Sequence, residues 1–149
     1  MLELIAIPIL VGFITQIIKL IIDGIPNNLD WQHIVSDYGG MPSSHTAFIA
    51  SLVTVVGIRE GINSTAFAIA LVLLTVVARD AIGFRREIGK NAKFTNSVAK
   101  AVFKTKKVTY LNEKMGHRLI EVIAGLLTGI GLSVILYPTY LWLVSNYLI

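Results

Sequence analysis

One stretch of the chain decides its fold: Gly39-Gly40-Met41-Pro42-Ser43-Ser44-His45-Thr46-Ala47, which runs from a glycine turn into an apolar segment ending near Ile58. Proline and serine favour the first positions of a helix, where backbone N–H groups lack partners and the dipole is positive. A helix start of this kind binds anions, phosphate above all, and a histidine there can exchange a proton near neutral pH. A capped helix start with a packed histidine has the same sequence, so the remaining chain must decide between the two.

The 149-residue chain is strongly apolar, with 54% hydrophobic and only 15% charged residues and a mean hydropathy of +0.72. Several runs approach the roughly 20 apolar residues that a bilayer crossing needs. We therefore predict an all-α integral membrane protein in which residues 1–149 form a single domain. The chain has no cysteine, which excludes disulfides, thiolate catalysis and cysteine-ligated metal.

The hydropathy pattern predicts four spans. The first, Leu2–Ile22, lacks a basic leader and a small-residue cleavage site, so we interpret it as a retained helix. A tight turn at Arg59-Glu60-Gly61 makes the second and third spans an antiparallel pair. Pro138 is expected to end the fourth span and to leave a short apolar segment behind it. The other predicted elements are 43–58, 63–83, 117–137 and the C-terminal segment 139–149.

Nine of the thirteen basic residues fall between positions 84 and 116: Arg85, Arg86, Lys90, Lys93, Lys100, Lys104, Lys106, Lys107 and Lys114. Apolar residues recur there at helical spacing, at Phe94, Val98, Ala101 and Val102. This pattern predicts a basic amphipathic helix on an anionic membrane surface, or a solvated helix packed on its own protein. The positive-inside rule assigns this region to the cytoplasmic face of the cell membrane.

The spans alternate in direction, so the ends of the first and third lie at the same face as the starts of the second and fourth. Snorkelling at helix ends explains lysines and arginines there, but it does not explain two histidines and a glutamate on apolar helices. Ionisable residues at such positions are expensive and mark functional sites. The polar groups predicted at this face are Lys19, Ser43, Ser44, His45, Arg79, Asp80, Arg85, Arg86, His117, Arg118 and Glu121.

His117 and Glu121 are four residues apart and therefore lie on one helical face. The carboxylate can accept the N–H of one imidazole nitrogen, which leaves the other nitrogen available as a nucleophile or ligand. Arg85 and Arg86 have the fork geometry that binds phosphate bidentately. The pattern predicts a phosphate site with His117 as the activated imidazole and His45 as the imidazole for proton transfer.

Other chemistries fit the sequence less well. No H-E-x-x-H motif occurs, and a site rich in arginine and lysine repels a divalent cation, so we predict no metal and no cofactor. Ser43 and Ser44 are not part of the G-x-S-x-G turn of a serine hydrolase. The basic region has no aromatic stacking platform or reader motif, which argues against nucleic acid as a partner.

Three motifs follow one another over about residues 10–135: Gly39-Gly40-Met41-Pro42-Ser43-Ser44-His45, then Asp80-x-x-Gly83-x-Arg85-Arg86-x-x-Gly89-Lys90, then Gly116-His117-x-x-x-Glu121-Val122-x-Ala124-Gly125. In this order they resemble the type 2 phosphatidic acid phosphatase superfamily, which also includes vanadium-dependent haloperoxidases. The resemblance is closest to the small divergent branch of that superfamily.

The resemblance implies that His117 attacks phosphorus to form a phosphohistidine and that Glu121 orients His117. It also implies that His45 protonates the leaving alcohol and later activates water. Ser43 and Ser44, with their backbone N–H groups, would hold phosphate oxygens. No metal would be required, because cations and helix ends stabilise the charge of the transition state.

The chain departs from the pattern of the superfamily at four places. The first motif, a lysine followed seven residues later by Arg-Pro, is missing, and Lys19 is its nearest equivalent. Leu111 stands where the third motif has an arginine, Ser44 where glycine is usual, and Glu121 where the main family has an aspartate. Three residues are candidates to replace the missing arginine: Arg85, Arg86 and Lys90.

We therefore predict a multi-pass phosphatase that acts on a lipid phosphate monoester or diphosphate, with the bilayer supplying the substrate's apolar chain. The alternative is a non-catalytic protein of the same fold that binds phospholipid head groups or carries a phosphorylated lipid. Gly125 and Gly129 form a GxxxG step, which predicts close helix packing and would also allow a homodimer.

Overall fold

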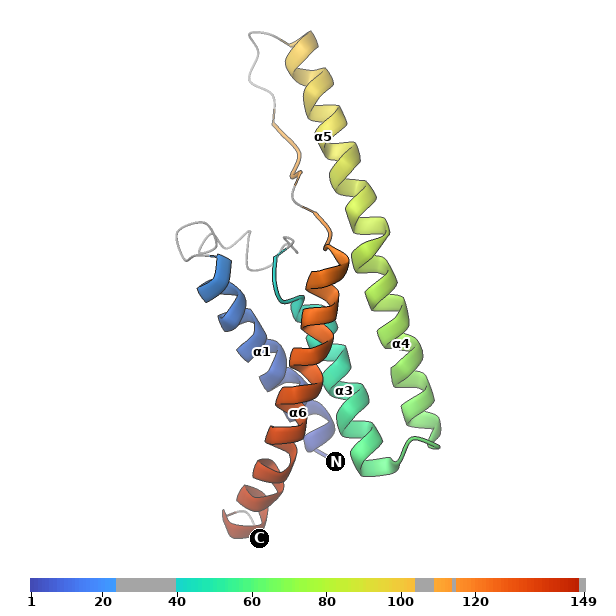
Figure 1. The fold of residues 1–149 in the computed structure, drawn as a ribbon, viewed down its shortest axis with the longest axis vertical. Coiled ribbons are helices and arrows are strands. Elements are labelled where there is room, and N and C mark those ends of the chain that lie inside the picture. Colours follow the sequence, from blue (N-terminus) through green and yellow to red (C-terminus); the bar gives the residue numbers. More distant parts are fainter. Residues whose placement is uncertain (24–39, 104–108, 114, 148–149) are drawn as a thin grey trace.

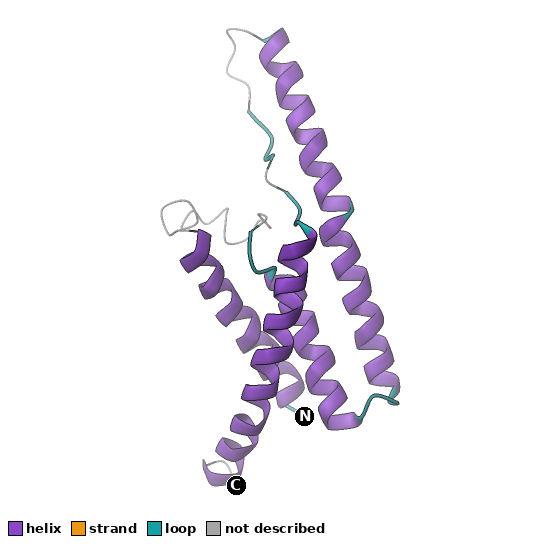
Figure 2. Cartoon of the chain, in the orientation of Figure 1, coloured by secondary structure: helices purple, strands orange, loops and turns teal. Residues whose placement is uncertain are grey.

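The structure is a computed structural model that describes residues 1–23, 40–103, 109–113 and 115–147. All regular elements in these ranges are helices (Figure 2), which confirms the all-α prediction. Five residues named in the sequence analysis lie outside the described residues: Gly39, Lys104, Lys106, Lys107 and Lys114. The helices are α1 (Glu3–Asp23), α3 (Ser44–Glu60), α4 (Thr65–Ile82), α5 (Phe84–Val102) and α6 (Leu119–Tyr147).

Helix α3 is the central helix of the bundle and packs against α1, α4 and α6 (Figure 1). Helix α6 approaches α3 closely because two glycines face it. A Cβ on Gly125 would lie 2.4 Å from the Ser43 carbonyl oxygen, and one on Gly129 would lie 2.4 Å from the Ala47 carbonyl oxygen. The GxxxG step therefore serves packing within the chain, as predicted. Since α3 covers this step, it gives no support to a homodimer.

Helix α1 turns one face to the bundle, and its buried residues repeat every four positions. Ile7 and Val11 join Ala47 and Val55 of α3 in the hydrophobic core. The same face carries an acidic residue, Glu3, near one end and a basic one near the other. The row that repeats every four positions is Glu3, Ile7, Val11, Thr15 and Lys19, and Pro8 beside it is buried as well. The opposite side of α1 exposes large apolar residues, as a lipid-facing side does.

Three of the four predicted spans are helices long and apolar enough to cross a membrane: Glu3–Ile22, the continuous stretch Thr65–Val102, and Leu119–Asn146. The 17-residue α3 is shorter than these, which agrees with the short second span expected from sequence. That α3 also crosses the membrane stays a prediction.

Helix α6 corrects one expectation, because it does not end before Pro138 but continues to Tyr147. The prediction of a separate C-terminal segment is therefore wrong for the described residues. A proline costs its helix one hydrogen bond, yet leaving the helix in apolar surroundings would cost several more unpaired backbone groups. The Thr139 hydroxyl also donates to the Ile135 carbonyl oxygen at 2.9 Å, across the proline.

Helix α5 projects beyond the bundle from the end of α4, and residues 109–113 return beside it (Figure 1). Asn96 fastens the returning segment. Its amide nitrogen donates to the Leu111 carbonyl oxygen at 2.8 Å and its amide oxygen accepts the Leu111 N–H at 2.9 Å. A Cβ on Gly89 would lie 2.8 Å from the Met115 carbonyl oxygen, so α5 also contacts the chain at Met115. This arm leads the chain back to the start of α6.

The structure distinguishes between the two placements predicted for the amphipathic helix α5. The side that packs on the chain carries Gly89, Ala92 and Asn96, which are buried. The predicted apolar row faces outward instead, and Phe94 is 72% exposed. Among the described residues, the row of Phe94, Val98 and Val102 therefore does not pack on its own protein. Its placement on an anionic membrane surface stays a prediction.

Candidate functional site

His117 is held at the start of α6 by its backbone and its side chain. Its N–H donates to the Ala81 carbonyl oxygen of α4 at 3.0 Å. Its Nδ1 lies 2.9 Å from Glu121 Oε2, an oxygen that also accepts the N–H groups of Arg118 at 3.1 Å and Gly40 at 3.3 Å. An ionised carboxylate can only accept, so Nδ1 carries the proton and Nε2 keeps its lone pair. This tautomer is the one that a nucleophilic imidazole requires.

His45 lies on the first turn of α3 and shares a cavity with His117, although the two residues belong to different motifs. The cavity has a volume of about 200 Å³. Its walls come from α3, from the end of α4, from the start of α5 and from His117. The lining residues are His45, Val76, Val77, Asp80, Ala81, Arg85 and His117. The structure therefore brings the two imidazoles and one arginine of the predicted phosphate site around one space.

A second, larger cavity of about 440 Å³ also has His117 in its wall. Its wall contains the Glu121 carboxylate, which is hydrogen-bonded to His117, and it also contains two arginines. Its lining residues are Gly40, Arg86, Glu113, Met115, Gly116, His117, Arg118 and Glu121. His117 is only 5% exposed and contributes to both cavities. The imidazole is therefore shielded from bulk solvent while remaining next to space for a ligand.

Lys19 of α1 is buried, with 8% of its surface exposed, and lies within electrostatic range of both imidazoles. The pKa of His117 is lowered, chiefly because burial penalises its charged form. The positive charge of Lys19 lowers this pKa further, whereas the hydrogen bond to Glu121 opposes the shift. Burial and Lys19 together therefore favour the neutral form of His117.

The two serines of the second motif hold helices together in this structure. The Ser43 N–H donates to the Glu121 carbonyl oxygen at 3.0 Å, and the buried Ser43 hydroxyl accepts from Thr46 at 3.0 Å. The Ser44 hydroxyl donates to Gln16 Oε1 of α1 at 2.8 Å. These groups thus have protein partners, and their contacts with phosphate stay a prediction. Both serines align the start of α3, and with it His45, against α6 and α1.

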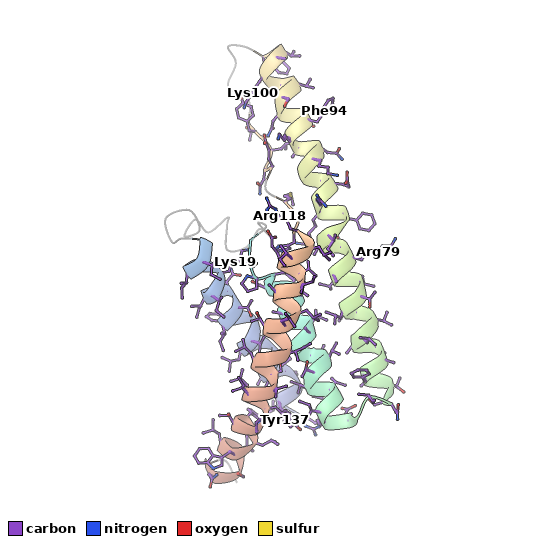
Figure 3. All side chains as sticks on the ribbon, viewed as in Figure 1. Lys19, Arg79, Phe94, Lys100, Arg118 and Tyr137 are labelled. Atoms are coloured by element: carbon purple, nitrogen blue, oxygen red, sulfur yellow. The ribbon has the colours of Figure 1, made fainter. Side chains whose placement is uncertain are left out.

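The cationic residues separate into three groups. Arg85 lines the cavity with both histidines, whereas Arg86 lines the larger cavity. Lys90 lies in neither lining, because its ammonium is exposed and donates to Glu87 at 2.6 Å one turn earlier on α5. Figure 3 shows Lys19, Arg118 and Arg79 at a similar level of the bundle, but Arg79 points away from the other helices.

Three residues that shape this site were named in the sequence motifs but were given no role there. Asp80 accepts a hydrogen bond from Arg85 Nε at 2.6 Å, inside the cavity with both histidines. Gly40 donates to Glu121, and Gly116 lets the chain pass the start of α5, since a Cβ there would lie 2.5 Å from the Arg86 nitrogen. Gly116 also has a φ of +89°, which favours glycine. For Asp80, the sequence signal was the run from Asp80 to Arg86, in which an acidic and a basic residue lie on either side of a helix-breaking glycine.

Two comparisons with known proteins gave a match. A family model described as "Divergent PAP2 family" matches residues 2–132. The "Uncharacterized membrane protein YuiD" of Bacillus subtilis (strain 168) is 37% identical over 136 residues, which cover 81% of this chain and 85% of the relative. No solved structure matches the chain.

Proposed function

The chain belongs to the divergent PAP2 family, and from that premise we propose that it is a membrane phosphatase that hydrolyses a lipid phosphate monoester or diphosphate. The observation that carries the proposal is the shared cavity of His45 and His117, with Arg85 in its wall. The bonding of His117 Nδ1 to Glu121 supports it further, because this contact leaves Nε2 as a nucleophile.

In the first step, the lone pair of His117 Nε2 attacks phosphorus, and the bond from phosphorus to the leaving oxygen breaks. His45, in its protonated form, gives its proton to that oxygen, so the lipid alcohol or lipid phosphate leaves with the proton on the oxygen that was bonded to phosphorus. The product on the enzyme is a phosphohistidine. Glu121 stabilises the positive charge that forms on the His117 ring.

In the second step, neutral His45 takes a proton from water while the water oxygen attacks phosphorus. The bond from His117 Nε2 to phosphorus breaks, inorganic phosphate leaves, and both imidazoles return to their starting states. Arg85 in the cavity and the nearby Lys19 would stabilise the negative charge on the phosphoryl oxygens in both steps. None of these steps calls for a metal.

We further propose that α3 is a fourth membrane-crossing helix and that the site faces the cytoplasm. Helix α3 is surrounded by α1, α4 and α6, and the start of α1 and the end of α6 lie at the end of the bundle opposite the site (Figure 1). The basic residues of α5 lie beyond the site end, which favours the cytoplasm. A single cysteine introduced at Ser97 should react with impermeant thiol reagents only in inverted vesicles. Labelling in right-side-out vesicles would contradict this orientation.

The decisive test is chemical trapping. The purified protein is mixed with a radiolabelled lipid phosphate, stopped within milliseconds to seconds, and examined for an acid-labile, base-stable phosphoenzyme. We expect the adduct in the original protein and none in His117→Ala, whose phosphate release should also be lost. In His45→Ala, formation of the adduct and its breakdown should both slow.

The alternative function is that of a head-group binding protein or lipid carrier without catalysis. The observation that favours it is that the Ser43 N–H and both serine hydroxyls already form hydrogen bonds with protein groups. Saturable lipid phosphate binding with neither an adduct nor released phosphate would support this alternative and contradict the phosphatase.

A further inference from the structure

Asp80 and Arg85 form an ion pair that an uninterrupted helix would not support. Residues five apart on an α-helix point about 140° away from each other. Here the helix stops between them, since α4 ends at Ile82 and α5 begins at Phe84. The Gly83 N–H donates to the Arg79 carbonyl oxygen at 2.8 Å, and a Cβ on Gly83 would lie 2.9 Å from that oxygen. The break at Gly83 allows Arg85 Nε to meet Asp80 Oδ2 at 2.6 Å.

This pair lies in the cavity that holds both histidines, where an acidic residue needs an explanation. A carboxylate repels an anionic substrate, so in a phosphate site it weakens binding unless it has another effect. Its contact with Arg85 provides that effect, because an arginine side chain has many rotamers and a fixed partner at Nε selects among them. The guanidinium has further N–H donors at its Nη atoms, which can bind phosphate in a fork.

We propose that Asp80 is a positioning residue that holds the Arg85 guanidinium in the orientation that binds the phosphoryl group. This inference rests on the proposed phosphatase function and deepens it. It assigns to Arg85, held by Asp80, the role that the missing arginine at Leu111 would have had. Leu111 itself is fastened to Asn96 of α5 and lies in neither cavity lining.

The proposal makes a prediction opposite in sign to simple electrostatics. If Asp80 acted only through its charge, Asp80→Asn would make the cavity more positive and would tighten phosphate binding. If Asp80 acts by positioning Arg85, the same substitution loosens the guanidinium and weakens phosphate binding. A charge-assisted hydrogen bond of this kind corresponds to about a tenfold change or more in affinity.

The test is a double-mutant cycle on the full chain in lipid nanodiscs, with Asp80→Asn, Arg85→Ala and the double variant. Two quantities are measured: the dissociation constant of inorganic phosphate, and kcat/KM for release of phosphate from a lipid phosphate. We expect Asp80→Asn to weaken both about tenfold alone and less than about twofold in the Arg85→Ala background. Arg85→Lys keeps the charge but lacks the fork, and it should reproduce the loss even if Asp80→Asn fails to fold.

Glu87→Gln is the matched control, since Glu87 is an exposed carboxylate near the start of α5 that pairs with Lys90 and lines neither cavity. It should leave both quantities unchanged. Tighter phosphate binding by Asp80→Asn, or an equal loss in both backgrounds, would overturn the positioning role while the phosphatase stands. An original protein that neither binds phosphate nor releases it would instead refute the proposed function, and this inference with it.

Discussion

The two ends of the buried face of α1 carry opposite charges and use them differently. Glu3 and Lys19 are sixteen residues apart on this face, or about 24 Å along the helix. Glu3 is neutralised directly by Arg59, the basic residue in the last turn of α3. Lys19 lies instead near the two imidazoles that line a cavity.

The charge at one end stabilises the packing of two helices, whereas the charges at the other end lie beside the imidazoles of the candidate site. At the Glu3 end, the carboxylate meets a full opposite charge, and the pair joins α1 to α3. At the other end, the carboxylate of Glu121 accepts one imidazole and two backbone N–H groups and leaves the imidazole beside open space. Burial of a charge is therefore common to both ends, and what distinguishes the candidate site is how the charge is satisfied.

The largest expected effect comes from replacing the carboxylate at the cavity end. Glu121→Gln should lower kcat for phosphate release by about three to four orders of magnitude. The amide can donate to Nδ1 and so favours the wrong imidazole tautomer, as in serine proteases that lose their triad carboxylate. The kcat of the purified variant and its thermal melting temperature would be measured together, and the melting temperature should change little.

Glu3→Gln is the matched substitution at the opposite end. It should cost about 1–2 kcal/mol of stability, between the values for exposed and buried ion pairs, because Arg59 is partly exposed. Turnover per folded molecule should remain that of the original protein. If Glu3→Gln lowered turnover as much as Glu121→Gln does, the two ends of the buried face would not differ in function as described here.

The second effect concerns the helix contact that aligns the cavity end. Gly125→Ala places a methyl group where the Ser43 carbonyl oxygen is 2.4 Å away, so α6 must move from α3. We expect a loss of about 1–3 kcal/mol in the free energy of unfolding, together with weaker activity, since Ser43 also bonds the Glu121 carbonyl oxygen. Reversible unfolding in detergent would measure the stability.

Gly131→Ala provides the control for this contact, because a Cβ on Gly131 meets no atom within 4 Å. This variant should be as stable as the original protein or slightly more stable, since alanine favours helices. Equal destabilisation by both alanines would mean that the close approach of α6 to α3 does not determine stability.

The smallest effect is a shift of pH dependence. Because the pKa of His117 is lowered, turnover should fall as the pH drops through that pKa and the ring becomes protonated. The folded protein holds the His117 ring in its neutral form. The stability that this preference contributes is therefore also lost as the pH falls through the lowered pKa of His117. Lys19→Met removes a charge that lowers this pKa, and the acidic limb should move to higher pH. A profile of kcat/KM between about pH 5 and pH 8 would detect it.

Two outcomes for the acidic limb of the pH profile would contradict the influence of Lys19 on His117. If Lys19→Met leaves the limb in place while Glu3→Gln moves it, the influence on His117 comes from the wrong end of α1. A limb that moves to lower pH would mean that Lys19 does not act on His117 through its charge.

Local spacing predicted much of what the structure contains. The interval of four residues between His117 and Glu121 predicted their contact, although α6 begins only at Leu119 and His117 precedes it, so the two do not share a helical face. The GxxxG step predicted a close helix approach, since helical periodicity places its two glycines on one face. Alternation of the spans predicted that His45 and His117 would lie at one end of the bundle, which is how the structure arranges them.

Contacts that depend on helix breaks or on rotation about a helix axis were not predictable in the same way. The partner of Arg85 follows from the break at Gly83, and the division of Arg85 and Arg86 between two cavities follows from how α5 is rotated. The continuation of α6 through Pro138 depends on its surroundings, which a local proline rule does not include.

The sequence alone determined that this protein is helical, apolar enough for a membrane, and polar at the ends of its helices, because these properties come from the order and period of neighbouring residues. The tertiary structure decided which polar groups satisfy one another and which remain beside a cavity. Those choices depend on how helices distant in sequence are spaced and rotated, and side-chain packing among α1, α3, α4 and α6 sets that geometry.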